Sequence, residues 1–138
     1  MSHDRFRVFS LVAAALTMVA GLALRGYGYS IGLTFPVVKY GGSVLWGSMV
    51  YFLTLALLPH ARRSTTLLAA SMFSVAVELF RLVHVDALDA FRLTTAGALL
   101  LGRVFSAWNI VAYLVGIALA CAVSALFPAR SCRKSVSS

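Results

Sequence analysis

Residues 110–127 read IVAYLVGIALACAVSALF, a run without a charged side chain. As an α-helix this run would rise about 27 Å at about 1.5 Å per residue, close to the ~30 Å hydrocarbon thickness of a bilayer. Other apolar runs have a similar length, and the set is Val8 to Leu24, Gly42 to Leu58, Leu67 to Val85 and Ile110 to Phe127. The sequence therefore predicts an all-α integral membrane protein with four transmembrane helices.

The composition supports a lipid environment. Of the 138 residues, 61% are hydrophobic and 12% are charged, which is far from the balance of a soluble domain. We expect a single transmembrane domain over residues 1–138, ending in a basic cytoplasmic tail at residues 128–138. The net charge of +8 is spread between the apolar runs rather than clustered, so we expect no nucleic-acid partner.

Two segments leave the number of spans open. Val8 to Leu24 follows two arginines, as a signal peptide would, but its length favours a retained span. Leu93 to Leu101 would rise only about 14 Å as a helix, so we expect a short half-membrane or interfacial helix there. The alternative is a fifth span that recruits residues from both flanks.

The lysine and arginine residues predict the orientation, because the cytoplasmic ends of membrane helices carry the excess of these residues. With the N-terminus inside, the larger group of basic residues lies on the inner side. We therefore expect a bacterial inner (plasma) membrane protein with both termini in the cytoplasm. The larger group is Arg5, Arg7, Arg62, Arg63, Arg130, Arg133 and Lys134, and the smaller is Arg25, Lys39, Arg92 and Arg103.

The segment VELFRLVHVDALDAFR, residues 77–92, is the main candidate for a functional site. Glu78 and Arg81 are three positions apart on an apolar helix, so their side chains lie on one face. A carboxylate in such surroundings is costly unless it is paired or protonated. The pair therefore indicates either a functional site or a tie between helices.

Three functions fit this segment, and whether the protein is an enzyme stays open. Glu78, His84 and Asp89 are candidates for acid–base catalysis on a lipid-borne substrate. A structural subunit is another possibility, with charges that only lock helices together. Our leading hypothesis is binding of an anionic envelope lipid or lipid-linked cell-wall precursor at the outer leaflet. The basic residues expected to hold its phosphate are Arg25, Lys39, Arg81, Arg92 and Arg103.

We expect no metal site and no cofactor, and membrane lipid as the partner, with the oligomeric state open. A metal would need two or more His or Cys near the acids, and only His84 lies on that side. His3 and His60 belong to the opposite side. Cys121 and Cys132 lie at different depths, so we expect two free thiols.

Three segments of the chain resemble one family. FPVVKYGGSVLW from Phe35, VELFRLVHVDALDAFR from Val77 and AGALLLGRVFSAWNIVAYLVGIALA from Ala96 are similar to the small bacterial membrane proteins called domain of unknown function 2809. That family in turn resembles the VanZ-like group associated with teicoplanin resistance. The resemblance implies a compact helical bundle in the plasma membrane and no established reaction.

The resemblance also identifies three departures. Family members are expected to carry an acid where Ser43 stands, a glutamine where Arg81 stands and an aspartate where Asn109 stands. Each change removes an acid or adds a cation, which suits anion binding but would alter a site that works through those acids. The matching positions, to which the resemblance lends importance, are Arg25, Lys39, Trp46, Glu78, Asp89, Arg92, Gly97, Gly102 and Tyr113.

Overall fold

The computed structural model describes residues 2–100 and 105–127, and every regular element in this part is an α-helix. Three of the helices, α1, α2 and α6, are long and apolar enough to cross a membrane. The predicted all-helical membrane fold is confirmed to this extent, and the number of four spans stays a prediction. The helices are α1 (His3–Tyr27), α2 (Phe35–Leu57), α3 (Arg63–Phe80), α4 (Asp86–Arg92), α5 (Thr95–Leu100) and α6 (Ala107–Ala125).

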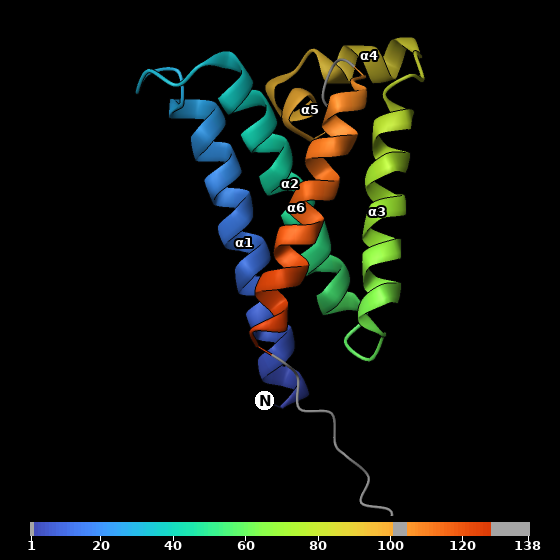
Figure 1. Cartoon of the computed structure of the whole chain (residues 1–138). Helices are drawn as coiled ribbons and strands as arrows, with labels where there is room; N and C mark the ends of the chain where they lie inside the picture. Colours follow the sequence, from blue (N-terminus) through green and yellow to red (C-terminus); the bar gives the residue numbers. More distant parts are fainter. Residues whose placement is uncertain (1, 101–104, 128–138) are drawn as a thin grey trace, which may run out of the picture.

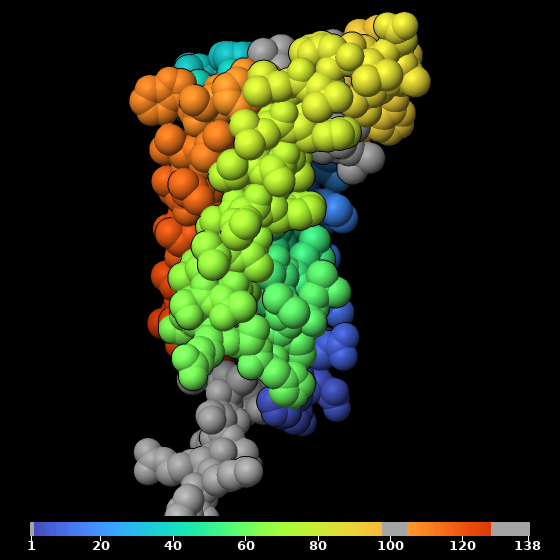
Figure 2. Space-filling view, turned by 90° about the vertical axis from the view of Figure 1, so that its right-hand side faces the viewer, coloured from blue at the N-terminus to red at the C-terminus, as the bar shows by residue number. Residues whose placement is uncertain are grey.

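The four longer helices, α1, α2, α3 and α6, run side by side (Figure 1). α2 contacts the other three, and α3 also contacts α6. The start of α1 and the end of α6 lie at the same end of the bundle, which we call the terminal end (Figure 1). The short helices α4 and α5 lie at the opposite end, which we call the loop end; Figure 2 shows α4 above α3 there.

Apolar side chains cover the outside of the bundle. Large exposed examples are Leu16 on α1, Leu53 on α2, Met72 on α3 and Leu119 on α6. Soluble monomers rarely expose apolar patches of this extent, whereas a membrane helix must present such a surface to lipid. The surface therefore agrees with the composition.

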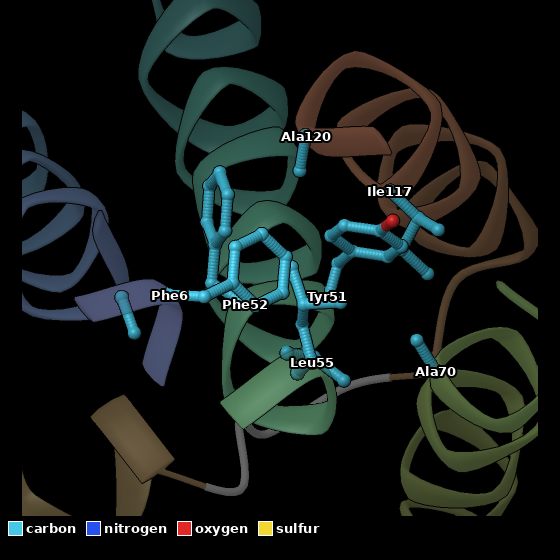
Figure 3. Close-up of a cluster of buried hydrophobic side chains, with 9 residues drawn as sticks. Phe6, Tyr51, Phe52, Leu55, Ala70, Ile117 and Ala120 are labelled. Carbon is cyan, nitrogen blue, oxygen red and sulfur yellow. The ribbon is translucent and has the colours of Figure 1, made fainter. Parts of the chain in front are cut away.

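The apolar core lies where α1, α2, α3 and α6 meet toward the terminal end. Figure 3 shows Tyr51 and Phe52 of α2 between Phe6 of α1 and Ile117 of α6. Tyr51 is fully buried, and its hydroxyl lies 3.2 Å from Ser124 Oγ, so its one polar atom is satisfied inside the core. This core holds the terminal end of the four longer helices together.

α2 and α6 approach each other most closely at two glycines. A Cβ on Gly47 would overlap the backbone of Tyr113, and a Cβ on Gly116 would overlap the carbonyl group of Val44. Ser48 Oγ donates a hydrogen bond to the carbonyl oxygen of Gly116 at 2.9 Å. Small residues permit such close packing in membranes, where van der Waals contact and hydrogen bonds drive helix association.

α3 ends earlier than the apolar pattern predicts. The apolar run continues to Val85, but the helix stops at Phe80 and the chain turns before α4 begins at Asp86. Arg92 on α4 donates to the carbonyl oxygens of Phe80 at 2.9 Å and Val83 at 2.8 Å. The last carbonyl groups of a helix lack helical partners, so Arg92 closes the end of α3.

α5 is the short helix in the apolar segment that follows α4. It has six residues, and at about 1.5 Å per residue it rises about 9 Å, which is too short to cross a bilayer. Gly97 allows α5 to turn against α4, because a Cβ there would overlap the carbonyl group of Phe91. The described part of this segment fits the predicted short helix rather than a fifth span; residues 101–104 lie outside it.

Candidate functional site: a buried carboxylate

Glu78 lies fully buried in the last turn of α3, where the described contacts to its carboxylate are three hydrogen bonds and one ion pair. Its Oε1 accepts from the backbone N–H of Ser106 at 2.9 Å and from Asn109 Nδ2 at 3.2 Å. Its Oε2 accepts from the Tyr113 hydroxyl at 2.9 Å and from Arg81 Nη1 at 2.7 Å, the latter as an ion pair. A buried charge is tolerable when it is paired and hydrogen-bonded in this way.

The local structure of α3 and α6 explains why these donors converge. Arg81 is the C-cap residue of α3 and lies three positions after Glu78, on the same face. Ser106 is the N-cap residue of α6, and the first N–H groups of a helix lack helical partners and favour an anion. Asn109 and Tyr113 are four positions apart and so share one face of α6.

α2 completes the arrangement. Ser43 Oγ lies 3.4 Å from Asn109 Oδ1, and the rings of Trp46 and Tyr113 pack with their centroids 4.7 Å apart. Both Ser43 and Asn109 are buried. We call the set formed by Ser43, Glu78, Arg81, Asn109 and Tyr113 the Glu78 network; it joins α2, α3 and α6 near the loop end.

One family model, described as a protein of unknown function (DUF2809), matches residues 34–117. The chain belongs to the DUF2809 family. The matched segment runs from the start of α2 into α6 and includes every residue of the Glu78 network. α1 precedes the segment that matches DUF2809. No solved structure matches the chain.

The three positions expected to depart from the DUF2809 pattern lie together in the structure. Ser43, Arg81 and Asn109 all belong to the Glu78 network. An acid at position 109 would replace the amide that donates to Glu78 and would repel its carboxylate. In the structure an amide and a guanidinium contact the single carboxylate, and the hydroxyl of Ser43 contacts the amide, so the three positions form one connected set.

Asp89 and Arg92, the second acid–arginine pair of the predicted site, form a separate ion pair. The distance from Arg92 Nη1 to Asp89 Oδ1 is 3.1 Å, and Arg92 is buried while Asp89 is half-buried. Arg92 also closes the end of α3, as described above. This pair therefore braces α4 against α3, and its arginine is directed into the protein.

His84 lies apart from the Glu78 network. Its ring is exposed, and Nδ1 lies 2.9 Å from the carbonyl oxygen of Leu82. Among the described residues, no contact joins His84 to Glu78. Of the three predicted acid–base candidates, Glu78 lies in the network, Asp89 pairs with Arg92, and His84 contacts neither among the described residues.

Arg25 and Lys39 lie on adjacent helices at the loop end. Arg25 is half-buried and its side chain crosses α2 at Gly42, where a Cβ would lie 2.8 Å from Arg25 Nε. The ammonium group of Lys39 lies over the rings of Phe35 and Tyr40, both of α2, at 5.6 and 5.3 Å from their centroids. Arg103, the fifth predicted anion-binding residue, lies outside the described residues.

The remaining candidates for metal binding lie far from these acids. The rings of His3 and His60 stack at the terminal end with centroids 4.8 Å apart. Cys121 is a free cysteine, and Cys132 lies outside the described residues. Within the part of the chain that the structure describes, no cluster of three or more His, Cys, Asp or Glu residues is arranged to hold a metal ion.

Proposed function

We propose that this DUF2809 protein crosses the membrane four times, with α3 as the fourth span. α2 ends at the terminal end and α6 begins near the loop end, so the chain between them has to return along the bundle (Figure 1). α3 is the segment that makes this return. Its outer face carries exposed apolar side chains such as Leu68 and Met72, which suits contact with lipid.

We further propose that the terminal end faces the cytoplasm of a bacterium and that the protein lies in the plasma membrane as one domain. The described part of this end carries Arg5, Arg7, Arg62 and Arg63, and the basic residues of 128–138 follow α6 in the sequence. The positive-inside rule supports this orientation. A distant relationship to the VanZ-like group is part of the same proposal and rests on the three sequence segments.

The proposed activity is binding of a phosphate-bearing anionic lipid at the loop end, in the outer leaflet. One observation carries it: the two buried arginines each pair with an acid, whereas Arg25 and Lys39 form no ion pair among the described residues. With α1 and α2 spanning the membrane as proposed, these two cations lie at the level of the headgroup phosphates. Charge-assisted hydrogen bonds from arginine and lysine to phosphate are among the stronger polar contacts.

The same geometry supports a structural role for Glu78 over the enzyme alternative. A general acid or base has to exchange a proton with the substrate. Four donors already occupy both oxygens of Glu78, and His84 is exposed with its Nδ1 on the carbonyl oxygen of Leu82. We therefore propose that Glu78 and Arg81 hold α3 and α6 together and that Arg25 and Lys39 contact the ligand.

Native mass spectrometry of the gently purified protein tests this proposal. Arg25→Gln with Lys39→Gln should retain at least about a hundredfold less anionic lipid, because two charge-assisted bonds are lost, each contributes about 1.5 to 3 kcal/mol, and about 1.4 kcal/mol is a factor of ten. Arg7→Gln with Arg62→Gln removes the same charge at the terminal end and should retain more lipid than the first variant. Equal retention by the two double variants would contradict the proposal.

A further inference from the structure

An apolar groove lies between α1 and α2 at the loop end, with Ala96 of α5 on its wall. Its volume is about 360 Å³, within the range of about 300 to 1,000 Å³ that is usual for ligand pockets. Apolar side chains from both helices, among them Met18 and Met49, form most of its surface. Arg25 is the one charged side chain among the described residues that line it.

Two glycines give the groove its shape. Gly21 on α1 lines it without a side chain, and a Cβ there would make only an ordinary contact of 3.6 Å with Leu45 Cβ. Gly42 on α2 leaves the space in which Arg25 crosses the helix. The hydroxyl of Thr17 donates to carbonyl oxygens of its own helix, so it adds no open polar group.

The dimensions of the groove match one leaflet of a bilayer. Along α1 it extends from Arg25 to Thr17, about 12 Å at about 1.5 Å per residue. Along α2 it extends from Gly42 to Met49, about 10 Å by the same rise. Half of the ~30 Å hydrocarbon core is about 15 Å, so a groove with Arg25 at headgroup level reaches through most of one leaflet.

We propose that this groove holds one acyl chain of an anionic phospholipid whose phosphate contacts Arg25. The inference rests on the anion binding proposed above and identifies the ligand as an amphiphile rather than a soluble anion. In such a lipid the phosphate would contact the guanidinium of Arg25 at the charged end of the groove, and the acyl chain would lie along its apolar wall. A soluble anion would use the charge alone and leave the apolar wall unfilled.

A second apolar pocket provides an internal comparison. It lies between α2 and α6, has a volume of about 370 Å³, and is lined by residues including Val44, Trp108 and Val115. No charged residue is among the described residues that line it. If apolar surface alone retained lipid, this pocket and the groove would be occupied equally.

Photo-crosslinking distinguishes the two pockets. The full-length protein is reconstituted in phosphatidylcholine vesicles that contain phosphatidylglycerol with a photoreactive group in one acyl chain, and the adducts are mapped by peptide mass spectrometry. We expect adducts at groove residues such as Met18 and Met49 to exceed those at Val111 and Val115 by about tenfold, as one phosphate contact would produce. Equal labelling of both pockets would overturn the inference.

Two variants separate this inference from the proposed function. Gly21→Leu fills the groove and keeps Arg25, while Ala23→Leu adds the same side chain at an exposed position of α1. We expect Gly21→Leu to lower groove labelling about tenfold and Ala23→Leu to leave it unchanged. Should Gly21→Leu fail to fold by circular dichroism, Ala96→Leu fills the groove from the α5 side instead.

The combined results have distinct meanings. If Arg25→Gln and Gly21→Leu both lower labelling, the inference holds. If only Arg25→Gln lowers it, the anion proposal stands and the groove assignment is wrong. If only Gly21→Leu lowers it, a chain binds without a phosphate contact, and the inference as stated is wrong. If neither variant lowers it, both proposals are wrong.

Discussion

Glu78 is the residue on which the contact between α3 and α6 depends most. Glu78→Gln preserves the size of the side chain but removes the charge that pairs with buried Arg81. We expect the free energy of unfolding to fall by about 3 kcal/mol, because removing one partner of a buried ion pair costs about 3 to 5 kcal/mol. Denaturant titration in detergent micelles measures this change.

Two matched variants make that prediction specific. Glu78→Gln combined with Arg81→Gln should be more stable than Glu78→Gln alone, since the second change removes the buried cation that lost its carboxylate. Asp86→Asn removes an exposed acid at the same end and should change stability by no more than about 0.5 kcal/mol. A Glu78→Gln protein as stable as the unmodified chain would contradict the role assigned to the network.

Only the local half of the network could be predicted from the sequence. Glu78 and Arg81 are three positions apart on an apolar helix, and their ion pair follows from helical geometry. The other donors to Glu78 are 28, 31 and 35 positions away in the sequence, a separation that no helical period reports. The available signal was the four-residue spacing of Asn109 and Tyr113, two hydrogen-bonding side chains on one face of an apolar helix.

Among the elements, α3 shows most clearly what an apolar pattern leaves out. Hydropathy describes the surroundings of side chains, and by that measure the helix should continue to Val85. The helix ends at Phe80, where the turn N–H groups of residues 81–83 bond to its last carbonyl oxygens and Arg92, which comes after the turn, donates to the carbonyl oxygens of Phe80 and Val83. The end of α3 thus includes a contact from another element.

Arg92→Gln should loosen the end of α3 while the rest of the bundle stays folded. The variant loses donors to the carbonyl oxygens of Phe80 and Val83 and the ion pair with Asp89. Because a hydrogen bond from a charged group contributes about 1.5 to 3 kcal/mol, we expect amide hydrogen exchange over residues 81–85 to become at least about tenfold faster. Arg62→Gln, an exposed change at the terminal end, should leave this exchange unchanged, and equal exchange in both variants would refute the capping role.

Gly116 sets the distance between α2 and α6. In Gly116→Ala the new Cβ would overlap the carbonyl group of Val44. Relieving this overlap would lengthen the hydrogen bond that Ser48 Oγ donates to the carbonyl oxygen of residue 116. We expect a loss of about 1 to 3 kcal/mol, the usual cost of overpacking, measured by the same denaturant titration. Gly26→Ala is the control, because no atom lies within 4 Å of a Cβ at Gly26; a similar loss in both variants would indicate a backbone effect rather than helix packing.

For the molecule as a whole, composition and run length predicted the helical membrane bundle, because lipid admits only apolar helices or closed barrels. The sequence predicted a short helix after α4 but not the contacts that position α4 and α5 at the loop end. There, α4 and α5 are too short for a periodic signal, and their positions depend on an arginine and a glycine that contact other elements. The sequence thus predicted the apolar helices that lipid requires. It did not predict the features that depend on contacts between particular residues of different elements.

The number of crossings is tested by the side on which the two ends of α3 lie. His60, in the turn before α3, and Asp86, after it, are both exposed, so a cysteine at either position can be labelled. With Cys121 and Cys132 changed to alanine, we expect Asp86→Cys to react with a membrane-impermeant maleimide on intact cells. His60→Cys should react only after the cells are permeabilised.

Labelling from opposite sides would require α3 to cross the membrane, and the excess of arginine near His60 predicts that this end of α3 is inside. If both cysteines react from the same side, α3 does not cross, α6 has to start on that side, and the two ends of the chain lie on opposite faces of the membrane.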